Sequence, residues 1–236
     1  MIAIYALKCP AVMEKELFNR FLQALPEEKR ERVHRFRNPA DSYRTLLADV
    51  LVRSLICEAY EISNDEIKYD YNAYGKPSLK SSFPNFCFNV SHSGEWVVCA
   101  THDSQVGIDV EQISPIELDI ATHYFAPAEV EDLLAKHPDE QVSYFYDLWT
   151  LKESYIKARG MGLSIPLQSF AIRKKRDQSI TISQSDSRDA WEFQQYEIDP
   201  GYKLSVCATT NQFAAHVVRK DLQDLYQAIF HRKISR

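Results

Sequence analysis

Glycine is scarce in this sequence, with 6 residues among 236. The sequence has no Gly-rich phosphate-binding loop, which disfavours a Mg²⁺-dependent nucleotidyltransferase or phosphotransferase built on such a loop. No apolar run approaches the ~18 residues that a membrane span needs, so we expect no membrane association. The first ten residues, MIAIYALKCP, lack the basic region, long apolar segment and cleavage site of a signal peptide. They are typical of a first strand instead.

Paired cysteines and an excess of positive charge are also missing. The five cysteines are scattered, odd in number and without paired spacing, which indicates reduced thiols in a cytoplasmic protein. A net charge of −5 and a pI near 5.8 make general nucleic-acid binding unexpected. An anionic ligand must therefore be met by a local basic patch.

Helical and strand-like patterns alternate along the chain and predict an α+β fold. Proline, acidic first turns and a glycine mark the helix ends, including Asn38-Pro39 before a long helix and Gly160 after another. The expected helices are 13–25, 26–36, 40–60, 127–137, 139–159 and 220–233. The expected strands are 1–10, 67–71, 86–90, 96–101, 105–111, 169–174, 179–183, 190–198 and 202–210.

Two pairs of similar short segments indicate an internal duplication. LVRSLI at 51–56 returns as LKESYI at 151–156, and VCAT at 98–101 returns at 206–209. Because both pairs occur in the same order, they favour a tandem repeat of two α+β halves, residues 1–112 and 113–236. We expect each half to pack a long helix on a small antiparallel sheet, with a ligand site in the cleft between the halves.

The segment GIDVEQI, residues 107–113, reads as a short strand. Side chains alternate between the faces of a strand, so Asp109 and Glu111 point to one face while Ile108 and Val110 point to the other. Two interpretations are open. The carboxylates either keep an edge strand soluble, or they form part of a Mg²⁺ site, which prefers rigid oxygen ligands.

A third carboxylate lies in WTLKESYIKARG. On a helical wheel Glu153 falls between Trp149 and Tyr146, where an unsatisfied carboxylate is costly. Lys157, one turn further on, either forms an ordinary i,i+4 pair with Glu153 or belongs to a site with it.

Two segments have features that suit an anion, and a turn lies between them in the sequence. EEKRERVHRFRN, residues 27–38, places five basic residues on a short helix, either as a solvated face or as a phosphate-binding patch. YGKP at 74–77 is a turn. NVSHSGEW at 89–96 ends a strand with Ser91, His92 and Ser93, whose hydroxyls and amides suit an anion. Adjacent residues on a strand point apart, so a Ser-His hydrolase dyad is not expected.

Taken in order, YGKP, NVSHS, GIDVE and WTLKESYIK resemble the motifs of the 4′-phosphopantetheinyl transferases of the surfactin-synthetase-activating type. The resemblance extends from PEEKRERVHRF to DPGYKLSVCA, and it is closest to the enzymes that serve bacillar peptide-antibiotic synthetases. It implies an intramolecular pseudo-dimer of two α+β halves with coenzyme A between them. It also implies a monomer, since both half-sites lie on one chain.

The resemblance further implies a role for each matching residue. Asp109, Glu111 and Glu153 are expected to hold Mg²⁺, with Mn²⁺ as an alternative, on the pyrophosphate of coenzyme A. Catalysis is assigned to Glu153 and Lys157. The residues expected to contact coenzyme A are Lys29, Arg32, Thr45 and His92 at the 3′-phosphate, the backbone of Tyr74, Gly75, Lys76 and Pro77 at the adenine, and Ser91 and Lys157 at the pyrophosphate. Arg32 departs from a family lysine, but arginine also binds phosphate, and bidentately.

The implied reaction moves the 4′-phosphopantetheine group from coenzyme A to a serine of an apo peptidyl or acyl carrier domain, with release of adenosine 3′,5′-bisphosphate. Glu153 is expected to take the serine proton, directly or through a metal-bound water. The residues Ile116, Leu118, Tyr124 and Phe125 form either an apolar groove for a carrier-protein helix or part of the second half's core. The alternative function is a non-catalytic module that binds coenzyme A or carrier proteins.

Overall fold

The computed structural model describes residues 1–80, 86–175, 179–184 and 190–231. The helices are α1 (Lys15–Gln23), α2 (Glu27–His34), α3 (Pro39–Tyr60), α4 (Ala121–Tyr124), α5 (Pro127–Leu134), α6 (Pro138–Arg159) and α7 (Leu222–Tyr226). The strands are β1 (Ala3–Lys8), β2 (Tyr69–Tyr71), β3 (Pro77–Leu79), β4 (Cys87–Ser93), β5 (Trp96–His102), β6 (Val106–Gln112), β7 (Phe170–Lys174), β8 (Ile180–Gln184), β9 (Glu192–Tyr196), β10 (Tyr202–Ala208) and β11 (Val218–Lys220). In this part of the chain, no helix is both long enough and apolar enough to cross a bilayer.

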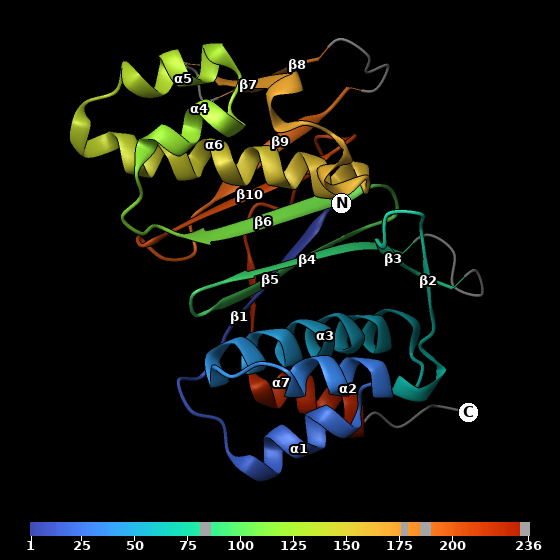
Figure 1. Ribbon diagram of the computed structural model, residues 1–236. Helices are drawn as coiled ribbons and strands as arrows, with labels where there is room; N and C mark the ends of the chain where they lie inside the picture. The colour runs from blue at the N-terminus through green and yellow to red at the C-terminus, as the bar shows by residue number, and fades with distance from the viewer. Residues whose placement is uncertain (81–85, 176–178, 185–189, 232–236) are drawn as a thin grey trace.

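Two central sheets lie between two layers of helices (Figure 1). One sheet has the strand order β11-β1-β5-β4 and the other β6-β10-β9, while β2-β3 and β7-β8 form separate hairpins. Helices α1, α2, α3 and α7 lie on the outer side of the first sheet, and α4, α5 and α6 lie on the outer side of the second (Figure 1). This mixed architecture confirms the predicted α+β class.

The same elements occur twice in the same order. The series β1, α3, β2–β3 and β4–β5 is followed by β6, α6, β7–β8 and β9–β10, and both long helices have 22 residues. The VCA segments lie in β5 and β10, which both pair with neighbours on both sides. The repeat found in the sequence therefore corresponds to a repeat of structure.

The predicted boundary after residue 112 stays a prediction. β6 ends at Gln112 and pairs antiparallel with β10, so its hydrogen bonds place it in the second sheet. By this pairing we propose that the second half begins before β6.

Local sequence signals explain the helix ends. Asn38 accepts a hydrogen bond from the backbone N–H of Ala40 and Pro39 is the first residue of α3, as predicted for this start. Gly160 ends α6 with a φ of 66°, a conformation that glycine adopts without strain. The predicted terminal helix is shorter than expected. It consists of α7 and a π-helical turn, Gln227–His231, and its last expected residues lie outside the described part. β3 and β11 are short strands that the sequence did not predict.

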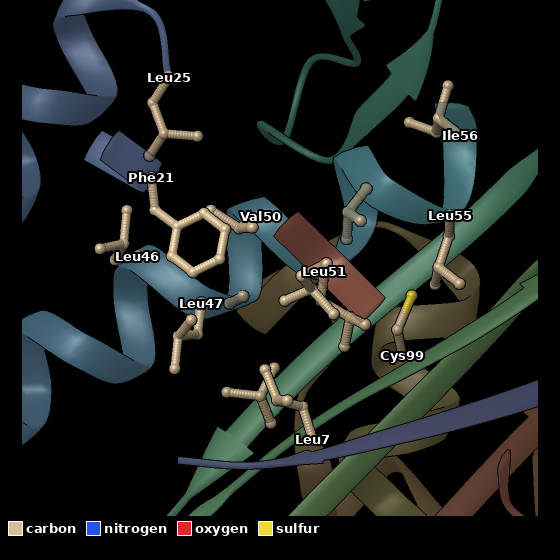
Figure 2. Packing of buried hydrophobic residues seen from close by; sticks show 14 of the residues in the cluster. Leu7, Phe21, Leu25, Leu46, Leu47, Val50, Leu51, Leu55, Ile56 and Cys99 are labelled. Atoms are coloured by element: carbon tan, nitrogen blue, oxygen red, sulfur yellow. The ribbon is translucent and has the colours of Figure 1, made fainter. Parts of the chain in front are cut away.

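The core consists of three apolar layers and a smaller cluster of residues from α4, α5 and α6. Between α3 and the first sheet, side chains such as Leu7, Leu47, Leu51 and Cys99 pack together (Figure 2). Between the two sheets, alternate residues of β1, β5, β6 and β10 form a second layer, and α6 packs on β7, β9 and β10 in a third. Each fully buried leucine or phenylalanine contributes ~1.5–3 kcal/mol, so this packing fixes the sheets relative to each other.

β6 carries the GIDVE motif, and its two faces have different neighbours. Ile108 and Val110 belong to the layer between the sheets, as the alternation predicted. The opposite face meets α6 at Gly107, where an added Cβ would lie 2.0 Å from the carbonyl oxygen of Ser154. Glycine at this position therefore lets helix and strand approach closely, and the carboxylates further along β6 face the helix.

Candidate active site

A pocket of about 510 Å³ lies at the junction of the two halves. The first half contributes residues of α2, α3 and β4, and the second contributes residues of β6 and α6. Its lining includes all the predicted metal ligands, both predicted catalytic residues and all the predicted phosphate contacts, namely Lys29, Arg32, Thr45, Ser91, His92, Asp109, Glu111, Glu153 and Lys157. The structure thus brings together residues that are more than a hundred positions apart in the sequence.

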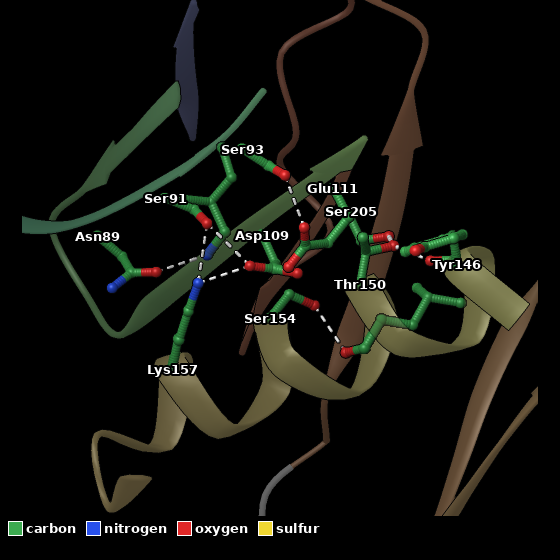
Figure 3. Close-up of polar contacts among 12 residues, drawn as sticks. Asn89, Ser91, Ser93, Asp109, Glu111, Tyr146, Thr150, Ser154, Lys157 and Ser205 are labelled. Carbon is green, nitrogen blue, oxygen red and sulfur yellow. Dashed lines mark hydrogen bonds and ion pairs between the residues drawn. The ribbon is translucent and has the colours of Figure 1, made fainter. Parts of the chain in front are cut away.

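Asp109 is the most deeply buried acidic group of this pocket, with 2% of its surface exposed. Its Oδ1 accepts hydrogen bonds from Ser91 Oγ at 2.8 Å and from Lys157 Nζ at 2.6 Å (Figure 3). Its Oδ2 is buried and has no hydrogen-bond partner. An unpartnered buried carboxylate oxygen is costly, so this atom is available for a cation.

Glu111 is held by β4. Ser93 Oγ donates to Glu111 Oε2 at 2.7 Å (Figure 3). The same oxygen accepts from the backbone N–H of Gln112 at 3.1 Å. Asn89 Oδ1 accepts from the N–H of Ile108 at 2.8 Å. Alternate side chains of β4 therefore hydrogen-bond along the edge of β6. The interpretation in which Asp109 and Glu111 only keep an edge strand soluble requires a solvated edge, and this edge is covered.

Glu153 enters the pocket from α6, half-buried. Burial raises its pKa, the positive charge of Lys157 opposes this, and the negative charge of Asp109 adds to it. Burial and then Asp109 likewise raise the pKa of Glu111, against the hydrogen bond from Ser93. No ion pair joins Glu153 to Lys157, although both residues are described, because Lys157 pairs with Asp109 instead. The ordinary i,i+4 pair considered from the sequence is therefore not formed.

The three carboxylates suit a divalent cation in their chemistry. Among the described residues, no three acidic, histidine or cysteine side chains are grouped closely enough to hold a metal ion as they stand. However, Asp109 Oδ2 lacks a partner, and the mutual repulsion of the acids contributes to the raised pKa values of Glu111 and Glu153. A hard cation with oxygen ligands relieves both costs, so the residues fit Mg²⁺.

The opposite wall of the pocket is basic. Lys29 forms an ion pair with Asp49 at 3.1 Å, and Arg32 lies on the same helix. Desolvation in the pocket, followed by the charges of Arg44 and Lys157, lowers the pKa of His92. A neutral histidine beside two cations gains a proton readily when an anion binds, because the anion reverses the local charge.

Residues 74–77 do not line this pocket. The side chain of Tyr74 is 55% exposed, and Lys76 extends in another direction, towards the end of α6, where Nζ lies 2.6 Å from the carbonyl oxygen of Lys157. The contact between the backbone of this turn and an adenine stays a prediction. The contact of the Lys76 side chain with α6 was not predicted from the sequence.

The predicted carrier surface requires a correction. Phe125 is 1% exposed and packs against Phe145 and Trp149, so it is a core residue and cannot contact a carrier domain in this structure. Ile116 and Leu118 are half-buried against the same cluster. Tyr124 is 40% exposed and meets Trp149 edge-on. The interpretation of this segment as core is thus correct for Phe125.

Lys152, beside Glu153 in the sequence, points away from the pocket. Its ammonium is fully buried and donates to both oxygens of Glu129, at 2.8 and 2.7 Å, and to the carbonyl of Phe170 at 2.8 Å. Glu129 also accepts from the N–H groups of Ala126 and Ile172. This satisfied pair joins α5, α6 and β7, and so supports the helix that carries Glu153 and Lys157.

Two contributors to the site were not predicted from the sequence, and a third, Ser93, was predicted only as part of an anion-binding turn. Ser93 lies two residues after Ser91, on the same face of β4, so the period of the strand could have indicated its contact with Glu111. Asp49 follows Thr45 by one helical turn and could have been found in the same way. Trp149 lines the pocket four residues before Glu153.

Two family models and several known proteins match this chain. Residues 105–207 match the family model "4'-phosphopantetheinyl transferase superfamily", and residues 13–104 match "4'-phosphopantetheinyl transferase, N-terminal". The chain is similar to 4'-phosphopantetheinyl transferase Sfp of Bacillus subtilis, with 42% identity over 94% of this chain and 99% of that protein. It is also similar to 4'-phosphopantetheinyl transferase gsp of Aneurinibacillus migulanus, with 38% identity over 88% and 86%.

A more distant relative is the L-aminoadipate-semialdehyde dehydrogenase-phosphopantetheinyl transferase of Mus musculus, with 28% identity over 83% of this chain and 70% of that protein. The two family models together span nearly the whole chain and meet just before β6. Both the long matches and the shared motifs lead to one assignment. This chain belongs to the 4′-phosphopantetheinyl transferase family.

Proposed function

We propose that this protein transfers the 4′-phosphopantetheine group of coenzyme A to a serine of apo peptidyl or acyl carrier domains, and releases adenosine 3′,5′-bisphosphate. The domains of nonribosomal peptide synthetases are the proposed principal substrates, with those of fatty-acid or polyketide synthases as further ones. We propose Mg²⁺, or Mn²⁺ in its place, as the metal.

The observation that supports this function is the charge distribution in the pocket. One wall, from the first half, carries Lys29, Arg32 and His92, while the other, from the second half, carries three carboxylates and Lys157. Coenzyme A has a phosphate at one end of its nucleotide and a pyrophosphate at the other. A cationic wall and a metal-binding wall that face each other suit these two groups.

The proposed reaction follows from this arrangement. The serine hydroxyl of the carrier attacks the β-phosphorus of the pyrophosphate, the new P–O bond forms, and the bond to the adenosine 3′,5′-bisphosphate oxygen breaks. Asp109, Glu111 and Glu153 hold the metal, which when bound neutralises charge on the pyrophosphate oxygens. Lys157 neutralises the same charge from the protein side, and Ser91 helps to place it through a 2.9 Å hydrogen bond.

Glu153 is the proposed base. It lines the pocket beside Lys157 and Asp109, next to the proposed metal, so it can take the serine proton directly or through a metal-bound water. Holding the two substrates in line contributes ~7–11 kcal/mol of the barrier reduction. The two walls come from one chain, so we propose a monomer. Four of the five cysteines are buried in the core, which supports the proposed cytoplasmic location.

The test is to incubate the protein with coenzyme A, Mg²⁺ and an apo peptidyl carrier domain, and to measure the intact mass of the carrier. We expect the carrier to gain one phosphopantetheine group, and Asp109→Ala to lose this activity. Asp119→Ala, an exposed aspartate outside the pocket, serves as the matched control. If coenzyme A binds but no mass is gained, the protein is a binding module. If Asp109→Ala transfers at the full rate, the metal assignment is wrong.

A further inference from the structure

The end of α6 is held by a residue of the other half. The last carbonyl groups of a helix have no partner within the helix and need donors from outside. Gly160 N–H satisfies the carbonyl of Ile156, and the carbonyls of Lys157 and Ala158 are two of the three that follow it in α6. Lys76, from the first half, supplies their donors, with Nζ 2.6 Å from the oxygen of Lys157 and 3.2 Å from that of Ala158.

The same ammonium also binds the start of the carboxylate strand. Lys76 Nζ lies 3.2 Å from the carbonyl oxygen of Val106, the first residue of β6. Its three N–H donors thus match three carbonyl acceptors, and its charge lies at the helix C-terminus, where the helix dipole favours a cation. One side chain therefore joins the end of α6 to the beginning of β6.

This junction is adjacent to the proposed chemistry. Lys157, in the last turn of α6, pairs with Asp109 of β6 at 2.6 Å. The spacing between helix and strand is set at Gly107, where a Cβ would lie 2.3 Å from the backbone nitrogen of Ala158. Any movement of α6 away from β6 at this end separates the ammonium of Lys157 from the carboxylate of Asp109.

The turn that carries Lys76 is itself ordered by Asn72. The Oδ1 atom of Asn72 accepts from the N–H groups of Tyr74 and Lys76, both at 2.9 Å. Its Nδ2 donates to the carbonyl of Gly160 at 2.7 Å. Gly160 has no room for a side chain here, since a Cβ would lie 2.8 Å from Lys76 Cδ. The inner side of the turn is thus fastened to α6, and Tyr74 is exposed on it.

We propose that Lys76 is a positioning residue that fixes the catalytic helix against the carboxylate strand, and that it couples the nucleotide-binding turn to Lys157 and Asp109. The coupling part of the inference rests on the proposed function, in which the backbone of residues 74–77 borders the adenine. Lys76 acts through α6 and β6 and does not itself contact the reacting atoms.

The test compares Lys76→Met, which keeps the aliphatic stem but removes the donors, with Lys76→Arg, which keeps charge and donors. Lys80→Met, an exposed lysine at the end of the same hairpin, is the matched control. We expect Lys76→Met to lower kcat about 10–100-fold, as is typical when a group that orients a site is lost, with a smaller change in KM for coenzyme A. Lys76→Arg is expected to recover most of this loss. A kcat for Lys76→Met equal to that of Lys80→Met overturns the inference.

Amide hydrogen exchange provides a readout that does not depend on turnover. In Lys76→Met we expect faster exchange in the last turn of α6 and in the first residues of β6, and no such change in Lys80→Met. Adenosine 3′,5′-bisphosphate is expected to slow exchange at the end of α6 in the natural protein but not in Lys76→Met. If the natural protein transfers no phosphopantetheine, the proposed function fails, while unchanged exchange in Lys76→Met overturns the positioning role separately. If Lys76→Met does not fold, Asn72→Ala, which loosens the same turn, replaces it in both assays.

Discussion

Lys157 Nζ lies 2.6 Å from Asp109 Oδ1, so an amino group from the end of α6 neutralises the buried carboxylate of β6. The other oxygen of Asp109 remains without a partner. Two unit charges at about 4 Å attract by ~4 kcal/mol at the effective dielectric constant of a partly buried site. Lys157 therefore competes with any cation for Asp109, even though both are expected to act on the same pyrophosphate.

Removing this competition predicts opposite changes in two measurements. In Lys157→Met, we expect Mg²⁺ alone to bind about tenfold tighter or more, because the carboxylate loses its positive neighbour. Transfer to a carrier domain is expected to fall by about 10²–10³, because the charge on the pyrophosphate loses a stabilising group. Calorimetric titration with Mg²⁺ and the carrier mass assay measure the two effects.

The matched control for the Mg²⁺ titration is Lys29→Met, since Lys29 pairs with Asp49 on the opposite wall. Its Mg²⁺ affinity is expected to equal that of the natural protein. If Lys157→Met binds Mg²⁺ more weakly than the natural protein, Lys157 does not compete with the metal and the proposed ligand role of Asp109 is in doubt.

Ser93 predicts a second change at the metal side. Ser93→Ala removes the donor to Glu111 Oε2 and the acceptor for the N–H of Gln112. Loss of a group that orients a ligand typically costs 10–100-fold in metal affinity or activity, and we expect kcat/KM at limiting Mg²⁺ to fall by about this factor. Ser93→Thr keeps the hydroxyl and is expected to recover activity. Ser78→Ala, on the exposed face of β3, controls for the loss of a serine. Equal kcat/KM values for Ser78→Ala and Ser93→Ala contradict the role of Ser93 in positioning Glu111.

The buried pair of Lys152 and Glu129 predicts an effect on stability. Burial lowers the pKa of Lys152, and the negative charge of Glu129 opposes this, so the charge of Lys152 depends on Glu129. Lys152→Met leaves Glu129 buried without a counter-charge, and we expect a loss of about 3–5 kcal/mol in the free energy of unfolding. Urea unfolding followed by circular dichroism measures it.

The double variant Glu129→Leu with Lys152→Met is expected to recover most of that loss, since a well-packed apolar pair replaces a buried ion pair at little cost. Lys15→Met, an exposed lysine in α1, is the control. A single variant as stable as this control shows that the pair contributes nothing to the fold.

Lys76 predicts a dependence on pH. Burial lowers the pKa of its ammonium to about 8, and the nearby thiols of Cys87 and Cys207 oppose this shift. Burial also raises the pKa values of both thiols. Below that pH the charged group donates to three carbonyls. Above it, the neutral amine has two N–H donors and no charge to place at the helix C-terminus.

As the pH rises from about 7 to about 9, kcat of the natural protein is expected to fall relative to that of Lys76→Arg, because arginine keeps its charge over this range. The ratio of the two variants removes the titration of groups that they share. A ratio that stays constant across this range contradicts the dependence of the site on charged Lys76.

Most of the fold could be read from the sequence because its signals are local. The two long helices, the start of α3 at Pro39 and the stop of α6 at Gly160 follow from capping rules, and the alternation in GIDVE assigned each side chain of β6 to its correct face. Short strands such as β3 and β11 could not be read, because three residues carry too little periodicity and their pairing partners, β2 and β1, decide whether they are strands.

The two halves differ in a way that the repeat does not predict. The repeated VCAT segments align Cys99 with Cys207. Cys99 pairs with Tyr5 of β1, and Cys207 pairs with Gly107 of β6, so Tyr5 and Gly107 are equivalent positions. Two residues further along each strand, Leu7 of β1 is therefore equivalent to Asp109 of β6. Leu7 is buried in the first core layer. The repeat predicts two similar halves, but the side chains leave an acidic face on one strand and an apolar face on its counterpart.

The class of fold, the repeat, and the acidic and basic residues suited to a metal and a phosphate follow from local sequence patterns. Three contacts do not follow from such patterns: Lys157 pairs with Asp109 and not with Glu153, Phe125 packs in the core, and Lys76 binds the end of α6. The reason is physical: helix and strand periodicity is encoded within a few residues, whereas these contacts cross between the halves or depend on how the helices pack. Their geometry is set by close packing, as at Gly107, and no local pattern contains it.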